Sequence, residues 1–583
     1  MVYSSNSASK MQVIVKTPVW RRRLLLVAVL LSFAALLVRS VYLQSLHKNF
    51  LQKEGNARYS RTLSLQAYRG KILDRNGELL AISIPVETVW ANPSDVVINQ
   101  VQTKALAGLL TMQAAVVNKK LANTQREFVY IKRRVPPDVA AKVMSLNIPG
   151  IYSEREYKRY YPASEVTAHL VGFTGVDDTG QEGFELAQNT WLSGKSGSRR
   201  VLKDRQGHII EDLEAVKVPQ DGHDLVLSID RRIQYLAYRE LAKAVETNKA
   251  IAGAAIVLDA KTGEVLAMVN LPTYNPNNPI NVKGKTRNRA VTDTFEPGST
   301  MKPISVSAAL ESGNFTPESK IQTSPGTLSI GPATIHDSHP QGLITVGQVI
   351  QKSSNVGAAK MALTLKPEFL WGYFNQIGFG SPTHIGFPGE GSGRLRNYKT
   401  WRPIEQATMS FGHGISVTLL QLARAYTVFA NDGELRPVSL LKLNESPLGH
   451  QVYSAQVANE MKDMLETVVQ PGGTALKAQI AGYRVAGKTG TAHKLGAHGY
   501  EENKYVASFI GMAPASNPRL IMAVMIDEPS NGEYYGGSVA APVFSKVMAD
   551  ALRMLAIPQD APNNNVVIPS DEKNAEPEVK ETT

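Results

Sequence analysis

Hydrophobic residues gather first in an uncharged run from Leu24 to Val38, which continues past Arg39 to Leu43. The run approaches the roughly 20 apolar residues that a helix needs to cross a bilayer. Arginines stand directly before it, and basic residues on that side of a span favour a cytoplasmic N-terminus. No clear small-residue cleavage site follows, so an uncleaved anchor is favoured over a signal peptide. We predict a cytoplasmic segment over residues 1–20 and one membrane-spanning helix over residues 21–43.

Two hairpins and one helix are predicted farther along the chain. Asn76-Gly77 lies between two apolar pairs, which is a strong signal for a two-residue hairpin turn. Thr262-Gly263 divides the apolar stretch 254–271 into two strands. Apolar residues recur at helical spacing after Asp230, whose side chain suits a helix N-cap.

These elements divide the chain into two α+β domains and a tail. Residues 44–222 mix strand-like and helical patches without a convergent set of reactive side chains, so we interpret them as a non-catalytic pedestal or dimerisation-like domain. Residues 223–558 alternate helical and strand patterns and form the second domain. The polar, proline-bearing and acidic residues 559–583 are typical of a disordered tail.

Composition narrows the chemistry. The net charge of +12 is spread along the 583 residues without basic and aromatic clusters, which disfavours nucleic-acid binding. The chain has no cysteine, so disulfides, thiol nucleophiles and Cys-ligated zinc are excluded. The histidines form no recognisable metal motif, and we expect neither a metal nor another cofactor.

Lys488 belongs to two motifs with different chemistry. Residues 482–489 match a P-loop, and the apolar run ending at Asp527-Glu528 resembles a Walker B strand. A phosphate cradle, however, needs a helix directly after the lysine, with its N-terminal amides facing the anion. The stretch GTAHKLGAHGYEENK that follows is instead typical of a turn between strands, so the nucleotide-binding reading is disfavoured.

The same lysine completes a three-part signature of serine-acylating enzymes, S-x-x-K, S-x-N and K-T-G. S-x-x-K occurs five times, but only the tetrad at Ser299 has S-x-N 54 residues later, at Ser353, and K-T-G another 135 residues on, at Lys488. Pro297-Gly298 breaks the chain just before Ser299, and a helix can follow from Lys302. An ordinary N-cap serine beside an exposed lysine is the alternative when this tetrad is taken alone.

The spacing of Ser299 and Lys302 suits a nucleophile and its base. A lysine three residues after a serine lies on the same helix face one turn later, within reach of the hydroxyl. Lys302 must be neutral to accept the proton, and Lys488 is a plausible neighbouring cation that would lower its pKa. In the second motif, Ser353 can relay a proton and Asn355 can hold a substrate amide, although a loop that caps a helix is an equal alternative.

The third motif is predicted to line the cleft as a strand. Lys488, Thr489 and Thr491 would offer a cation and hydroxyls to a substrate carboxylate, with Gly490 between them. The backbone amides of Ser299 and Thr491 would form an oxyanion hole.

The segments FEPGSTMKP, SSN and KTGTA, with RGKILDRNG and GSRRVLKDRQGHIIED upstream, resemble class B penicillin-binding proteins over nearly the whole chain. The stretch NRAVTDTFEPGSTMKP is most similar to the cell-division branch, and the elongation branch is second. The resemblance implies a single transmembrane helix, an elongated pedestal, and a transpeptidase domain with an antiparallel sheet flanked by helices, as in serine β-lactamases.

What the resemblance implies for function is a serine-type D-Ala-D-Ala transpeptidase that cross-links peptidoglycan stem peptides during septal wall synthesis. β-Lactam antibiotics would mimic the donor peptide and stay bound to the serine. The implied location is the bacterial inner membrane at the division septum, with most of the chain in the periplasm. The implied partners are the glycan polymerase FtsW and other divisome proteins.

Two rival functions share these motifs. A β-lactamase would hydrolyse its acyl-enzyme with a carboxylate-activated water, and Glu390 is an available carboxylate. A catalytically silent division scaffold would keep the pedestal's contacts and not need the pocket. The anchor, the pedestal and the length argue against the β-lactamase.

Overall fold

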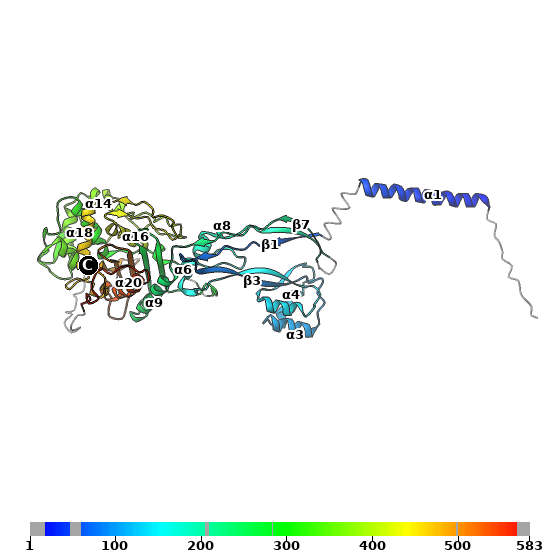
Figure 1. Cartoon of the computed structure of the whole chain (residues 1–583), viewed down its shortest axis with the longest axis horizontal. Coiled ribbons are helices and arrows are strands. Elements are labelled where there is room, and N and C mark those ends of the chain that lie inside the picture. The colour runs from blue at the N-terminus through cyan, green and yellow to red at the C-terminus, as the bar shows by residue number, and fades with distance from the viewer. Residues whose placement is uncertain are drawn as a thin grey trace, which may run out of the picture.

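The computed structural model of the chain describes residues 18–46, 60–203, 209–280, 282, 284–496 and 499–567. Figure 1 shows an elongated pedestal whose long strands run from a lobe carrying α3 and α4 to a larger domain that contains α9, α16 and α20. The pedestal elements are β1 (Ser60–Leu65), β2 (Ile72–Leu73), β3 (Leu79–Ala91), α3 (Gln100–Leu109), α4 (Ala114–Leu121), β4 (Val129–Val135), α5 (Pro137–Met144), β5 (Ile151–Tyr160), α6 (Ala168–Val171), α7 (Gly183–Ala187), α8 (Asn189–Leu192), β6 (Gly197–Lys203), β7 (Ile209–Lys217) and β8 (Leu225–Val226).

The larger domain holds the remaining elements. In chain order they are α9 (Arg231–Thr247), β9 (Ala252–Asp259), β10 (Val265–Leu271), α10 (Arg289–Thr292), η3 (Gly298–Met301), α11 (Lys302–Glu311), β11 (Lys320–Gln322), β12 (Thr327–Ile330), β13 (Ala333–His336), β14 (Leu343–Thr345), α12 (Val346–Lys352), α13 (Asn355–Leu363), α14 (Pro367–Gln376), α15 (Pro403–Met409), α16 (Leu419–Ala425), α17 (Thr427–Ala430), β15 (Glu434–Leu435), β16 (His450–Gln451), α18 (Ala455–Thr467), β17 (Ala486–Gly496), β18 (Gly499–Ala513), β19 (Leu520–Asp527), α19 (Gly536–Val539) and α20 (Ala541–Met554).

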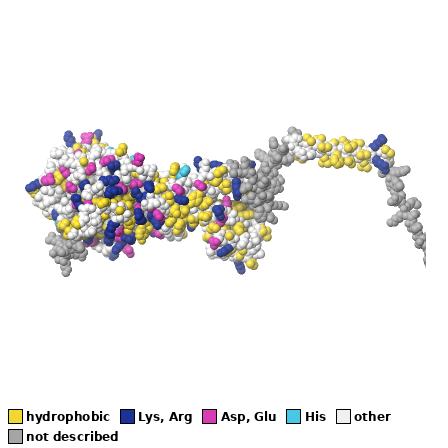
Figure 2. All heavy atoms as spheres, in the orientation of Figure 1, with side chains coloured by type: hydrophobic (Ala, Val, Ile, Leu, Met, Phe, Trp, Pro, Cys, Tyr) yellow, Lys and Arg dark blue, Asp and Glu magenta, His cyan; other side chains and the backbone are white. Residues whose placement is uncertain are grey.

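The first helix, α1 (Val19–Val41), is long and apolar enough to cross a membrane. Its apolar side chains are exposed along its whole length, and Figure 2 shows them with basic side chains at one end. The guanidinium of Arg39 lies 5.6 Å from the centre of the Tyr42 ring, so the one charge inside the apolar run has an aromatic neighbour near the helix end. The predicted cytoplasmic segment lies outside the described residues, apart from its last three.

The pedestal is built on β3, which pairs antiparallel with β2, β4 and β5. The hairpin turn predicted at Asn76-Gly77 joins β2 to β3, and the carboxylate of Asp74 accepts hydrogen bonds from the amides of Asn76 and Glu78 at 2.8 and 2.9 Å. At the far end, α3, α4 and α5 enclose a core of their own with β3 and β4. A separate sheet in the order β1-β6-β7 completes the pedestal.

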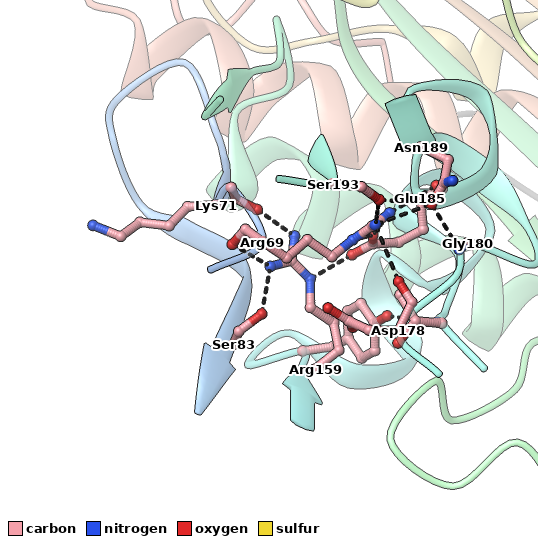
Figure 3. Close-up of polar contacts among 12 residues, drawn as sticks. Arg69, Lys71, Ser83, Arg159, Asp178, Gly180, Glu185, Asn189 and Ser193 are labelled. Carbon is pink, nitrogen blue, oxygen red and sulfur yellow. Dashed lines mark hydrogen bonds and ion pairs between the residues drawn. The ribbon is translucent and has the colours of Figure 1, made fainter. Parts of the chain in front are cut away.

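A buried ion network joins three distant segments of the pedestal (Figure 3). Glu185 accepts hydrogen bonds from Arg69 at 2.7 Å and from Arg159 at 2.6 Å, and the three side chains are at most 1% exposed. Arg69 donates further to Asn189 and Ser193. Two cations and one anion are thus buried together, and their charges are satisfied by fixed partners rather than by water.

The pedestal and the larger domain share one hydrophobic core. Ile72, Leu80 and Phe184 of the pedestal belong to the same buried cluster as the strands of the large sheet. Polar contacts close the junction, because the backbone amide of Arg231 donates to Asp74 and the side chain of Asn76 donates to Asp230, both at 3.1 Å. The two domains therefore meet through packed side chains and not only through a linker.

The large domain is organised around an antiparallel sheet in the order β10-β9-β19-β18-β17. The predicted hairpin at Thr262-Gly263 joins β9 to β10, and Asp230 caps α9 as predicted, by accepting a hydrogen bond from the amide of Arg232 at 3.0 Å. Helices α9 and α20 pack together against the sheet, while α16 packs on β9 and β19 and η3 packs on β17. A sheet flanked by helices is the expected architecture, and β17 lies at its edge.

The start of the predicted disordered tail is ordered. Asp560 accepts hydrogen bonds from the amides of Arg484 and Ser516 at 2.7 and 3.1 Å, and Asn565 accepts one from the amide of Gly482 at 3.1 Å. The expectation of disorder from residue 559 is therefore wrong for this stretch, because its polar side chains pair with backbone groups of the preceding domain. The rest of the tail, from residue 568, lies outside the described residues.

We predict that Glu185→Gln lowers the free energy of unfolding by about 3 to 5 kcal/mol, because it removes the carboxylate with which the buried Arg69 and Arg159 are directly paired. Thermal unfolding of the detergent-solubilised full chain measures the change. The control is Glu87→Gln, because Glu87 pairs with an Arg155 side chain that is 65% exposed and such pairs contribute less than about 1 kcal/mol. Equal losses in the two variants would contradict a structural role for the buried network.

Candidate active site

The site begins where η3 meets α11. Pro297 and Gly298, the latter with φ +55°, break the chain, and Ser299 follows within the short 3-10 turn η3. Lys302 is the first residue of α11, and its Nζ donates to the Ser299 Oγ at 2.9 Å. The predicted contact between the serine and the lysine three residues later is present in the structure.

The second segment reaches the same point from the turn between α12 and α13. Ser353 ends α12 in the left-handed region, with φ +62°, and Ser354 caps α13 by accepting a hydrogen bond from the amide of Gly357 at 2.9 Å. Lys302 Nζ donates to both the backbone oxygen and the Oγ of Ser353, the latter at 3.1 Å. The unusual backbone at Ser353 thus directs its hydroxyl and its carbonyl toward one amine.

The third segment is the edge strand β17, which carries Lys488. Its Nζ donates to the Ser353 Oγ at 2.8 Å, so two lysines from different elements share one hydroxyl. Both lysine side chains are fully buried. Burial and the nearby charge of Lys302 lower the pKa of Lys488 well below 10.5. A pair of amines held this way binds a second proton poorly.

Close backbone packing holds β17 against η3. A side chain on Gly490 would place its Cβ 2.9 Å from the Pro297 carbonyl oxygen and 2.5 Å from the Ser508 Oγ. On the other side, Tyr426 is fully buried and its hydroxyl donates to the carbonyl of Thr300 at 2.8 Å. The distance between the nucleophile segment and the strand is therefore set by backbone and by a buried ring, not by flexible side chains.

The remaining predicted residues lie in the same segments and have polar partners. Asn355 donates from its side-chain amide to the carbonyl of His336 at 2.9 Å. The hydroxyl of Thr489 is 2.8 Å from that of Thr474, and the Thr491 hydroxyl accepts a hydrogen bond from the amide of Gly536 at 3.1 Å. The structure thus brings Ser299, Lys302, Ser353 and Lys488 into direct contact and holds the others on the flanking turn and strand.

Sequence reasoning missed the residue that fixes the Ser353 turn. The carboxylate of Asp337 accepts a hydrogen bond from the Ser354 hydroxyl at 2.6 Å and another from the amide of Val356 at 2.9 Å. Asp337 follows β13 and stands in no recognised motif. Its role depends on a contact across the fold, so no local signal in the sequence indicated it.

A second missed group lies beside the nucleophile segment. Glu296 accepts hydrogen bonds from the amide of Gly414 and the hydroxyl of Tyr500 at 2.8 and 2.9 Å, and burial raises its pKa. His413 lies 3.8 Å from the same carboxylate. Burial and the charges of Lys302 and His493 lower the pKa of His413 to about 4, so its ring is neutral at pH 7.

The structure contradicts the P-loop interpretation that the sequence disfavoured. The residues after Lys488 continue as β17 to Gly496, so no helix begins where a phosphate would need its amides. The ammonium group points instead at the Ser353 hydroxyl.

This geometry suits nucleophilic acyl transfer. The Ser299 hydroxyl has a buried amine within hydrogen-bonding distance, and that amine is connected through the Ser353 hydroxyl to a second one. Such a chain can remove a proton from the nucleophile and deliver it to a leaving group. The short helical turn at Ser299 and the edge of β17 lie on the two sides of this chain.

Two family models match the chain. Residues 253–549 match the penicillin-binding protein transpeptidase domain, and residues 64–227 match the penicillin-binding protein dimerisation domain. The chain is 44% identical to the probable peptidoglycan D,D-transpeptidase PenA of Neisseria gonorrhoeae over 92% of this chain and 93% of that protein. It is also 44% identical to the peptidoglycan D,D-transpeptidase FtsI of Escherichia coli over 93% of each chain.

Solved structures agree with these matches. The transpeptidase domain of Burkholderia pseudomallei penicillin-binding protein 3 is 50% identical, with a TM-score of 0.54, and covers 58% of this chain and 98% of that chain. A peptidoglycan synthetase from Bifidobacterium adolescentis is 26% identical, with a TM-score of 0.69 over 87% of this chain and 99% of that chain.

We predict that Gly490→Ala destabilises the fold by about 1 to 3 kcal/mol, because the added methyl group overlaps the Pro297 carbonyl and the Ser508 hydroxyl. Gly372→Ala is the matched control, since Gly372 lies inside α14 with open space around it and alanine is the better helix former there. Thermal unfolding midpoints of the two variants check the prediction. A Gly490→Ala protein as stable as the control would show that β17 and η3 are not in tight contact.

Proposed function

This chain belongs to the class B penicillin-binding proteins, and we propose that it is a peptidoglycan D,D-transpeptidase that works through an acyl-enzyme on Ser299. The observation that carries the proposal is the contact of the Ser299 Oγ with the buried Lys302 Nζ at 2.9 Å. The approach of Lys488 to Ser353 on the same chain of hydrogen bonds adds to it. The names of the relatives, PenA and FtsI, give the substrate class.

In the proposed reaction, Lys302 accepts the proton of Ser299 as its oxygen attacks the carbonyl of the penultimate D-Ala of a stem peptide. The backbone amides of Ser299 and Thr491 stabilise the oxyanion. The bond to the terminal D-Ala breaks, and that residue leaves as a free amine after receiving a proton through Ser353. An amine of a neighbouring stem then attacks the ester, which forms the cross-link and returns the serine.

Each residue of the site has its own role in this proposed reaction. Lys302 is the base, Ser353 relays the proton, and Lys488 holds the Ser353 hydroxyl while facing the substrate carboxylate with Thr489 and Thr491. Asn355 orients a substrate amide, and Gly490 lets the backbone of β17 come close to η3. Asp337 is a positioning residue, because it acts through the turn that carries Ser353.

The two lysines share one proton in this proposal. Two ammonium groups on one buried hydroxyl would repel each other, so the second proton binds more weakly than it would to an ordinary lysine, and the apparent pKa values belong to the pair rather than to either residue. Burial, and after it the charge of Lys302, lower the pKa of Lys488. The sequence predicted the charge on Lys488 and the neutral form on Lys302, whereas the lowered pKa of Lys488 favours the shared proton on Lys302 before the attack. In the proposal, Lys302 becomes the base once that proton passes to Lys488 through the Ser353 hydroxyl.

The proposed location and partners are those implied by membership of the same family. We propose that α1 anchors the chain in the inner membrane with residues 1–20 in the cytoplasm and the domains 44–222 and 223–558 in the periplasm. A role at the division septum, with the polymerase FtsW and other divisome proteins, rests on the relationship to FtsI. β-Lactams would acylate Ser299 because they resemble the donor peptide.

We predict that Ser299→Ala abolishes covalent labelling of the full chain by a fluorescent penicillin, because the other hydroxyl on the Lys302 amine, that of Ser353, is also held by Lys488. The control is Ser439→Ala, since Ser439 opens another Ser-x-x-Lys tetrad but has no S-x-N after it. The fluorescence of the labelled protein band is measured after electrophoresis. Label that survives in Ser299→Ala would refute the nucleophile, and label that is lost within minutes from the native chain would favour a β-lactamase.

The rate of penicillin acylation should rise with pH along a limb that lies well below pH 10.5. The active pair has one neutral amine, so activity is present above the pKa of the pair and is lost as pH falls through it. In Lys488→Met the limb should move to higher pH, because the remaining amine no longer has a cationic neighbour. Stopped-flow acylation across pH measures the midpoint, and an unchanged midpoint would argue against a shared proton.

A further inference from the structure

A basic hollow lies beside the segments that carry Ser299 and Lys488. It encloses about 580 Å³ between residues 287–296, the loops at 394–396 and 414–416, and the C-terminal half of β17. We call it the arginine pocket, after Arg287, Arg289, Arg394 and Arg396, which all line it. The proposed reaction uses none of these arginines.

The pocket wall carries more positive charge than its own carboxylates neutralise. Arg287 and Arg289 both pair with Asp293, at 2.8 and 2.9 Å, so one anion serves two cations. Arg396 is satisfied by Glu405 at 2.7 Å. The exposed Arg394 side chain has no hydrogen-bond or ion-pair partner within the part of the chain that the structure describes. Arg394 and one of the two arginines on Asp293 are thus without a directly paired carboxylate, whereas Glu296, which also lines the pocket, is held by the Gly414 amide and the Tyr500 hydroxyl.

The opposite wall is polar but less charged. Lys494 of β17 pairs with both Asp527 and Glu528, at 2.9 and 2.7 Å, so this group has one carboxylate in excess. His493 lines the pocket next to it, and its Nε2 is buried without a hydrogen-bond partner among the described residues. A buried polar atom without a partner, in the wall of an open cavity, is typical of a position that a ligand or water satisfies.

Residues that line the pocket are close in sequence to reaction-centre residues in two segments, the one before Ser299 and the one after Thr491. Glu296, in its wall, stands three residues before Ser299, and Ala492 directly follows Thr491. Gly298 packs on these strand residues, because a Cβ there would lie 3.3 Å from the Thr491 carbonyl oxygen and 3.4 Å from the Ala492 Cβ. A peptide extended along β17 from Ser299 therefore passes the mouth of the pocket.

We propose that the arginine pocket binds a carboxylate of the stem peptide, on a residue upstream of the D-Ala that is transferred to Ser299. The inference rests on the proposed transpeptidase function and deepens it by naming the recognised part of the donor. Guanidinium groups bind carboxylates through two parallel hydrogen bonds, which fixes both the distance and the orientation of the ligand. Arg394 provides the free guanidinium, and the surplus charge of Arg287 and Arg289 supports it.

Recognition of this carboxylate would also distinguish stem peptides from penicillins as acyl donors. Benzylpenicillin has one carboxylate, and the proposed reaction places that group on Thr489, Thr491 and Lys488. A stem peptide has a second carboxylate several atoms upstream, which only the peptide can bring to the arginines. The pocket would thus increase affinity for the natural donor without a matching gain for simple penicillins.

The test compares two pentapeptides that end in D-Ala-D-Ala, one with the upstream glutamyl carboxylate free and one with that carboxylate converted to an amide. Each is used to slow the labelling of the full-length, detergent-solubilised chain by fluorescent benzylpenicillin. The free acid should protect the native chain at about a tenfold lower concentration than the amide, and added salt should reduce the difference. In Arg394→Ala the two peptides should protect equally, while the rate of labelling without peptide stays that of the native chain.

Lys399→Ala is the matched control, because Lys399 is an exposed cation only five residues away that does not line the pocket. It should keep the preference for the acid. A native chain that is protected equally by the two peptides, or by neither, would overturn the proposal, as would a preference that persists in Arg394→Ala or disappears in Lys399→Ala. Failure of the transpeptidase function is distinguishable, since it would appear as penicillin labelling that does not depend on Ser299 or as label that the native chain loses within minutes.

Discussion

Two lysine amines buried against one hydroxyl are the constraint on which the rest of the site depends. Like charges repel, and neither lysine is exposed to water, so the arrangement persists only where the surrounding backbone leaves no alternative. Three features fix that backbone. Ser353 is in the left-handed region, Gly490 has no side chain, and the buried Tyr426 donates a hydrogen bond to the Thr300 carbonyl. Burial and repulsion together lower the pKa of the pair, which keeps one amine deprotonated beside the nucleophile.

Much of this arrangement was predictable because it is encoded locally or by motif order. The turn at Asn76-Gly77, the cap at Asp230 and the contact of Ser299 with Lys302 each depend on residues within a few positions of one another. The grouping of three separate motifs followed from their order and spacing. The competing tetrad at Ser439, for example, has no S-x-N after it.

The parts that escaped prediction depend on contacts between distant segments. Asp337 reaches the Ser353 turn from the end of another strand, and Glu185 joins two arginines from elsewhere in the pedestal. The ordered start of the tail has the same cause, since Asp560 is fixed by amides that precede it by dozens of residues. Composition indicates whether such residues are polar, but only the fold determines which partners they meet.

The position of β17 at the sheet edge has a further consequence. An open edge can take up an extended peptide as an additional strand, yet it is equally a template for unwanted pairing between copies of the chain. Here the arginine pocket lies beside the edge, with guanidinium groups on its wall. An apolar strand that docked there would remove water from these charged groups without replacing the hydrogen bonds that water makes. The charges proposed to recognise a substrate carboxylate would thus also disfavour pairing of this edge with an apolar strand of another copy.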